Sequence, residues 1–149
     1  MSHSLTRVWV HSVLGTKNRQ PLLKDKMRTY LYKHIRKEME DMGCGVRIIN
    51  GIPDHIHIFF LLPKKFSIAQ IMKSMKGESS RWINQEDFLS IKFAWQVGYG
   101  AFSVSESIVP RVERYIRNQA KHHQTKSFAV EYQRLMDNHN LVICKSSTL

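Results

Sequence analysis

The chain has 149 residues, of which 42% are hydrophobic and 10% are aromatic. A chain of this length and composition can bury a full core, so we expect one domain spanning residues 1–149 and exclude an intrinsically disordered protein. Its 23 Lys and Arg residues exceed its 12 Asp and Glu residues, which gives a formal net charge of +11. So strong a positive charge favours a polyanionic partner, either nucleic acid or an anionic membrane surface.

The sequence argues against membrane insertion and secretion. The longest uninterrupted apolar run covers residues 58–62, whereas a membrane-spanning helix needs about 20 residues. Residues 1–7 contain no apolar signal core. Cys44 and Cys144 lie far apart and form no paired motif, which excludes a disulfide framework or a zinc ribbon. We therefore expect a cytoplasmic protein with no membrane partner.

Hydrophobic periodicity predicts an α+β fold in the order β-α-β-β-α-β, followed by helices. The predicted strands cover residues 5–14, 46–50, 55–62 and 93–104, the last interrupted at residues 98–100. The predicted helices of this unit cover residues 24–42 and 68–82, the second capped by Ser67. This order is typical of the ferredoxin-like or RRM-like antiparallel sheet, which carries its helices on one face and leaves the other free.

Further helices are expected after the sheet. Pro110 suits the first turn of a third helix that runs to about His123 and carries Tyr115. Ser127 is expected to cap a last short helix through Met136. Residues 141–144 are expected to form a small terminal strand.

A His-x-His pair lies inside the third predicted strand. Side chains alternate along a strand, so His55 and His57 share one face while Ile56 and Ile58 point to the other. Two imidazoles about 7 Å apart on one face can share a metal ion. Taken alone, the pair is equally compatible with two histidines on a solvated sheet face.

Tyr115 and Gln119 are four residues apart on the predicted third helix, so they share one helical face. A neighbouring apolar stripe anchors this helix and puts both side chains at the edge of its buried side. From that edge they can reach into a cleft. Taken alone, a tyrosine at such a position is also typical of a core border.

Further motifs occur in a fixed order along nearly the whole chain. They cover residues 9–13, 16–23, 53–57, 67–68, 72–77, 95–105, 115–119, 122–123, 127–128 and 131–132. This ordered set, which includes the His pair and the Tyr–Gln pair, resembles the single-tyrosine HUH transposases, transposase A of the insertion-sequence 200/605 superfamily.

The resemblance implies a DNA transposase with a metal-dependent active site. His55 and His57 would be the HUH metal ligands and Gln119 the third ligand, with Mg²⁺ or Mn²⁺ as the ion. Tyr115 would attack the scissile phosphate, forming a 5′-phosphotyrosine and freeing a 3′-OH. A second 3′-OH could then reverse the step and rejoin strands without ATP. Lys121 and the neighbouring residue 122, a histidine, are candidates for the base that takes the tyrosine proton.

The resemblance also implies the partners. These are single-stranded DNA with imperfect hairpins at the element ends, and a second copy of the chain in an obligate homodimer whose tyrosine helix can complete the partner's site. The protein is then expected at the prokaryotic nucleoid when it is bound to DNA. Basic side chains near the motifs are candidates for phosphate contacts: Lys17, Arg19, Lys73, Lys76, Arg81 and Lys121.

Two alternatives stay open, and a third, a histidine phosphoesterase or nucleotide hydrolase, is disfavoured by the sequence. A catalytically silent module could bind single-stranded nucleic acid with the same fold, although it has no need for all four site residues. A nucleotide hydrolase of the histidine-triad type would carry another histidine at position 59, where this chain has Phe59. A domesticated relative would apply the transposase chemistry to repeated genomic hairpins.

Overall fold

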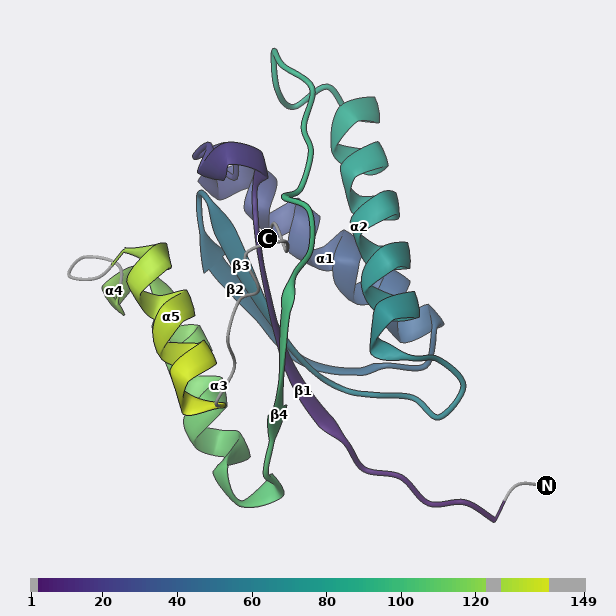
Figure 1. Ribbon diagram of the computed structural model, residues 1–149. Coiled ribbons are helices and arrows are strands. Elements are labelled where there is room, and N and C mark those ends of the chain that lie inside the picture. Colours follow the sequence, from purple (N-terminus) through teal and green to yellow (C-terminus); the bar gives the residue numbers. More distant parts are fainter. Residues whose placement is uncertain (1–2, 123–126, 140–149) are drawn as a thin grey trace.

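The computed structural model describes residues 3–122 and 127–139. Four strands, β1 (Trp9–Gly15), β2 (Gly45–Ile52), β3 (His55–Leu61) and β4 (Gly100–Val104), form one antiparallel sheet in the order β2-β3-β1-β4. Helices α1 (Asp25–Asp41) and α2 (Ile68–Gln85) pack side by side on one face (Figure 1). The predicted α+β fold and its β-α-β-β-α-β order are confirmed.

Local sequence explains where the helices on this face begin and end. Helix α1 buries Met27, Leu31, Ile35 and Met39, which recur every four residues along one helical face. Gly43 follows with a φ of 95°, the left-handed conformation that commonly ends a helix. Helix α2 begins after Ser67, whose hydroxyl accepts from the backbone N–H of Gln70 while the Gln70 side chain accepts from the backbone N–H of Ser67.

The second face of the sheet is covered, so the expectation of a free face is wrong. Helices α3 (Val109–Arg117), α4 (Gln119–His122) and α5 (Phe128–Asn138) pack there (Figure 1). The reason is that this face is also apolar and must be buried. Trp9 and Phe59 pack against α3, while Val13 and Phe102 pack against α5.

The predicted helix over residues 110–123 is divided in two at Asn118. The backbone of Asn118 leaves helical geometry at φ −96° and ψ 23°. The side-chain amide of Asn50 on β2 donates to the carbonyl oxygens of Ile116 and Arg117, both at 3.0 Å. These carbonyls are acceptors that a continuing helix would use itself, so their capture explains why α3 ends and α4 begins at Gln119.

The predicted strand over residues 93–104 is shorter than expected, because only Gly100–Val104 joins the sheet as a strand. Before it, Trp95 forms a single bridge to Thr16, and Gly98 turns the chain with a φ of 84°. The ammonium of Lys76 donates to the carbonyl oxygens of Gln96 and Gly98 at 2.8 and 3.0 Å and so fixes this segment. The predicted strand over residues 141–144 lies outside the described residues.

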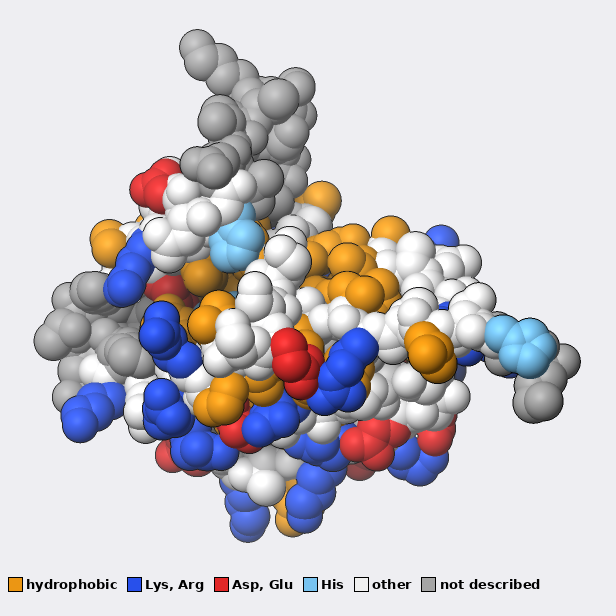
Figure 2. Space-filling model, turned by 90° about the horizontal axis from the view of Figure 1, so that it is seen from below, with side chains coloured by type: hydrophobic (Ala, Val, Ile, Leu, Met, Phe, Trp, Pro, Cys, Tyr) orange, Lys and Arg blue, Asp and Glu red, His pale blue; other side chains and the backbone are white. Residues whose placement is uncertain are grey.

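Basic side chains lie on the helices of both sheet faces. Figure 2 shows several of them near a hollow that contains hydrophobic side chains. The arginines of α3 and α5 are Arg111, Arg114, Arg117 and Arg134, all exposed. No described helix is both long and apolar enough to cross a membrane.

Two glycine substitutions test the packing of this fold. A Cβ added to Gly51 on β2 would lie 2.8 Å from the Cα of Ile56 on β3, so we expect Gly51→Ala to lower the free energy of unfolding by about 1–3 kcal/mol. A Cβ added to Gly77 on α2 meets nothing within 4 Å. Gly77→Ala should therefore raise the free energy by about 0.5–1 kcal/mol. Urea unfolding measures both, and equal effects of the two variants would contradict the packing described.

Candidate active site

The two histidines of β3 point to the face covered by α3, α4 and α5, and both are fully buried. The Nδ1 of His55 is 2.7 Å from Oδ1 of Asp54. Burial alone would lower the pKa of His55, but hydrogen bonds to Asp54 and Glu131 outweigh it and raise the pKa. An imidazole that donates its Nδ1–H to a carboxylate in this way presents its Nε2 to the site in a fixed orientation.

His57 is held by another histidine, His11 of β1. The Nδ1 of His57 lies 2.7 Å from the Nε2 of His11, and the two rings stack with their centroids 5.0 Å apart. Burial, with repulsion from His57, holds the pKa of His11 well below its usual range, so His11 is neutral and can accept the Nδ1–H of His57. His11 was not predicted as a site residue from the sequence, although it shares the strand face of Trp9 and Val13.

Gln119 and Tyr115 approach the histidines from α4 and α3. The amide oxygen of Gln119 lies 3.2 Å from the Nε2 of His55, and the Gln119 side chain is fully buried. The Tyr115 hydroxyl donates to Oε2 of Glu131. Burial, together with this hydrogen bond and the charge of Glu131, raises the pKa of Tyr115 above its ordinary value, so the hydroxyl keeps its proton at neutral pH.

Glu131 of α5 lies at the centre of these groups and was missed as a site residue. Its Oε1 lies 3.0 Å from Nε2 of His57 and 3.3 Å from Nε2 of His55, while the amide of Gln119 donates to its Oε2 at 3.0 Å. Burial alone would raise the pKa of this carboxyl, but hydrogen bonds to the two histidines outweigh it and hold the pKa well below its usual range. A carboxylate therefore faces the histidines and the tyrosine.

A signal for Glu131 was present in the sequence. Phe128, Glu131 and Tyr132 are spaced three and four residues apart, so the acid shares the buried face of α5 with two aromatic residues. An acidic residue at such a position is rarely fully buried unless it is paired. The pattern therefore predicts a partner for Glu131 inside the protein.

The site fits a divalent cation. One ligand atom from each of His55, His57 and Glu131 lies within 4.8 Å of the others, so this group could hold a metal ion. When neutral His55 donates its Nδ1–H to Asp54, its Nε2 is an acceptor that faces acceptor oxygens of Gln119 and Glu131. Buried acceptors that converge in this way are satisfied by a proton or a metal cation.

The six basic residues predicted to contact DNA do not gather around this site. Lys73, Lys76 and Arg81 lie on α2, across the sheet from the histidines. Lys17 and Arg19 lie in the short helix η1 (Lys17–Arg19), where the Arg19 guanidinium lies 4.5 Å from the ring centre of Phe128. Lys121 is exposed on α4. Of the six, Arg19 is connected to the site through Phe128. Arg19 contacts the Phe128 ring, which also stacks on His55 with ring centres 4.1 Å apart.

Comparison with known proteins identifies the family of this chain. A family model described as IS200-like transposase matches residues 4–119. The chain therefore belongs to the IS200-like transposase family, which is a family of DNA-processing enzymes.

Individual relatives agree with this assignment. The transposase of insertion sequence element IS200 from Salmonella typhimurium is 26% identical over 125 residues, covering 80% of this chain and 81% of the relative. The ISDra2 transposase TnpA from Deinococcus radiodurans is 24% identical over 114 residues, covering 73% and 81%.

Two solved structures share the fold. A Deinococcus radiodurans protein assigned as a transposase aligns with a TM-score of 0.65 at 22% identity, over 80% of this chain and 95% of that protein. A REP-associated tyrosine transposase, solved bound to a REP hairpin, aligns with a TM-score of 0.54 at 16% identity, over 82% and 74%.

The contact between His11 and His57 leads to a test of metal binding. We expect His11→Phe, which keeps an aromatic ring but removes the acceptor, to weaken Mn²⁺ binding about tenfold or more, because the His57 ring loses the partner that orients it. His11→Gln retains an acceptor oxygen and should weaken it less. Isothermal titration calorimetry measures both, with circular dichroism to check the fold. Equal affinity in all three proteins would contradict the orienting role.

Proposed function

We propose that this chain cuts and rejoins single-stranded DNA by metal-dependent transesterification, with Tyr115 as nucleophile and His55, His57 and Gln119 as metal ligands. One observation carries the proposal. The Tyr115 hydroxyl donates to one oxygen of Glu131, and the other oxygen of that carboxylate contacts both histidines. A nucleophile and a metal-binding group thus share a single buried carboxylate.

The donor set bears on the choice of metal. A bound divalent ion would polarise the scissile phosphate and offset the charge that builds on its oxygens. Two imidazole nitrogens with an amide oxygen suit Mn²⁺ better than Mg²⁺, because Mg²⁺ prefers oxygen ligands. Asp54 and His11 would keep the two rings oriented from behind.

The tyrosine must lose its proton as it attacks, because its pKa is raised. Glu131 already accepts the hydrogen bond of that hydroxyl, which favours Glu131 over Lys121, exposed on α4, as the proton acceptor. Attack forms a bond between the Tyr115 oxygen and phosphorus and breaks the bond to the 3′ oxygen. That oxygen then takes up a proton and leaves as a 3′-OH.

The substrate is proposed to be single-stranded DNA that carries imperfect hairpins. The REP-associated tyrosine transposase bound to a REP hairpin supports this choice, since it shares the fold. Hairpins at the ends of a mobile element and repeated genomic hairpins served by a domesticated relative would undergo the same chemistry. The homodimer stays a prediction, and one chain alone brings Tyr115 beside its own His57, with ring centres 6.0 Å apart.

A covalent adduct is the direct test of this function. Purified protein is mixed with labelled single-stranded oligonucleotides that tile both flanks of its own gene, with Mn²⁺, Mg²⁺ or chelator. We expect a metal-dependent adduct on a denaturing gel, and we expect none from Tyr115→Phe, which lacks the nucleophilic oxygen.

Two other results would each overturn the proposal. Cleavage that survives Tyr115→Phe would make water the nucleophile. Binding without any adduct across the full tiling would instead indicate a silent nucleic-acid-binding module. Tyr99→Phe serves as the matched control, because Tyr99 packs against the core on the α1 and α2 side, and it should form the adduct normally.

The role of Glu131 gives a separate prediction. Glu131→Gln keeps the size of the side chain but cannot take the tyrosine proton, so the rate of adduct formation should fall about 10²–10⁴-fold while DNA is still bound. Glu86→Gln, an exposed substitution at the end of α2, should react at the normal rate. Single-turnover gels give the rates, and an unchanged rate for Glu131→Gln would remove Glu131 from the reaction.

A further inference from the structure

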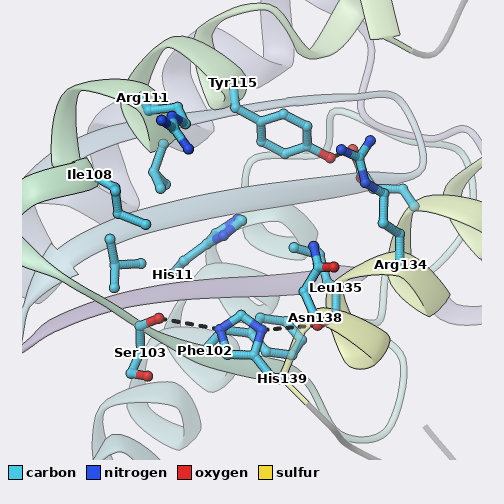
Figure 3. Close-up of a pocket in the computed structure, with 13 residues that line it drawn as sticks. His11, Phe102, Ser103, Ile108, Arg111, Tyr115, Arg134, Leu135, Asn138 and His139 are labelled. Atoms are coloured by element: carbon cyan, nitrogen blue, oxygen red, sulfur yellow. Dashed lines mark hydrogen bonds between the residues drawn. The ribbon is translucent and has the colours of Figure 1, made fainter.

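A cavity of about 390 Å³ opens beside Tyr115, between α3 and α5 and over the end of β4 (Figure 3). Its volume lies in the range of small-molecule sites. Much of its wall is apolar, formed by Phe102, Val104, Ile108, Val112 and Leu135. Tyr115, Glu131 and His11 line it as well, so the cavity is continuous with the candidate active site.

Two arginines line this cavity from opposite helices, Arg111 from α3 and Arg134 from α5. Figure 3 shows the Arg134 guanidinium beside the Tyr115 hydroxyl. Among the described residues, no carboxylate lies within ion-pair distance of either guanidinium, whereas Arg117 on α3 pairs with Glu113. Exposed guanidinium groups of this kind bind phosphate through two parallel hydrogen bonds.

The cavity also has polar groups suited to the edge of a base. Ser103, Asn138 and His139 contribute to its lining, and the His139 Nε2 lies 3.3 Å from the carbonyl oxygen of Ser103. Apolar walls, polar groups and two phosphate-binding side chains together match the face of a base, its polar edge and a phosphate.

We propose that this cavity binds one nucleotide of the DNA strand, the nucleotide next to the scissile phosphate. Its base lies against the apolar walls and its phosphate is bound by Arg111 and Arg134. The inference rests on the proposed function, because a nucleotide bound in this cavity would have the reacting phosphate beside Tyr115. It adds a protein site that holds the strand at the nucleophile, separate from any hairpin contact.

The test uses deoxynucleoside 5′-monophosphates as probes, in the presence of chelator. Binding is monitored through the backbone amide signals of the whole protein in NMR. We expect saturable shifts confined to residues 102–104, 108–115 and 134–139. The matching nucleosides, which lack the phosphate, should bind about tenfold more weakly, and Arg111→Gln and Arg134→Gln should each weaken monophosphate binding about tenfold. Arg114→Gln is the matched control, because Arg114 is an exposed arginine of the same helix that does not line the cavity.

Three results would overturn the inference. These are an equal loss of binding in Arg114→Gln, shifts that spread over the basic residues of α2 and η1, or no shift at the cavity. The adduct assay keeps this inference distinct from the proposed function. Saturable binding in the cavity without any adduct would contradict the transesterification proposal but support the nucleotide site. Adduct formation without shifts in the amide signals of the cavity residues would contradict only the nucleotide site.

Discussion

The buried carboxylate of Glu131 is the group on which the arrangement of the second sheet face depends. The side chain is 4% exposed, and an ionised carboxylate in such a place costs several kcal/mol unless every oxygen is paired. Its partners come from β3, α3 and α4, which are three separate elements. Apolar contacts bring these helices onto the sheet, and the requirement to compensate one charge fixes where α3, α4 and α5 lie relative to β3.

A second constraint acts from the far edge of the sheet. Asn50 on β2 captures two carbonyl oxygens of the chain near Asn118 and ends α3 there. Because the helix stops, Gln119 begins a new helix and reaches His55, while Tyr115 reaches Glu131 from the last turn of α3. In an uninterrupted helix the two side chains would stand one above the other on a single straight face.

Much of the fold follows from local sequence patterns. Alternation placed both histidines on one face of β3, and the apolar spacing of α1 with its terminal Gly43 predicted that helix to within a residue at each end. The cover on the second face was not predicted, because the β-α-β-β-α-β pattern accounts only for the two helices inside that unit. Trp9 and Phe59 already marked that face as apolar.

The parts that sequence reasoning missed depend on partners distant in the chain. The break at Asn118 requires Asn50, which lies more than 60 residues earlier. The centre of the site requires Glu131 to meet His57, which is 74 residues away. A local pattern predicts the conformation of one segment but not the distant residue that will contact it. The spacing of Tyr115 and Gln119 therefore predicts one continuous helix. The family resemblance grouped Tyr115 and Gln119 with the two histidines, but it assigned no role to Glu131 or Asn50.

The contact of Phe128 with both Arg19 and His55 has a consequence for how binding events combine. An anion that drew Arg19 away from the aromatic ring would change the surroundings of a ring that stacks on His55. If that change altered the affinity of His55 for a cation, thermodynamic reciprocity would require the cation to alter the affinity for the anion by the same factor. Cation binding at the histidines and binding of a DNA strand at η1 would in that case be coupled through the ring of Phe128.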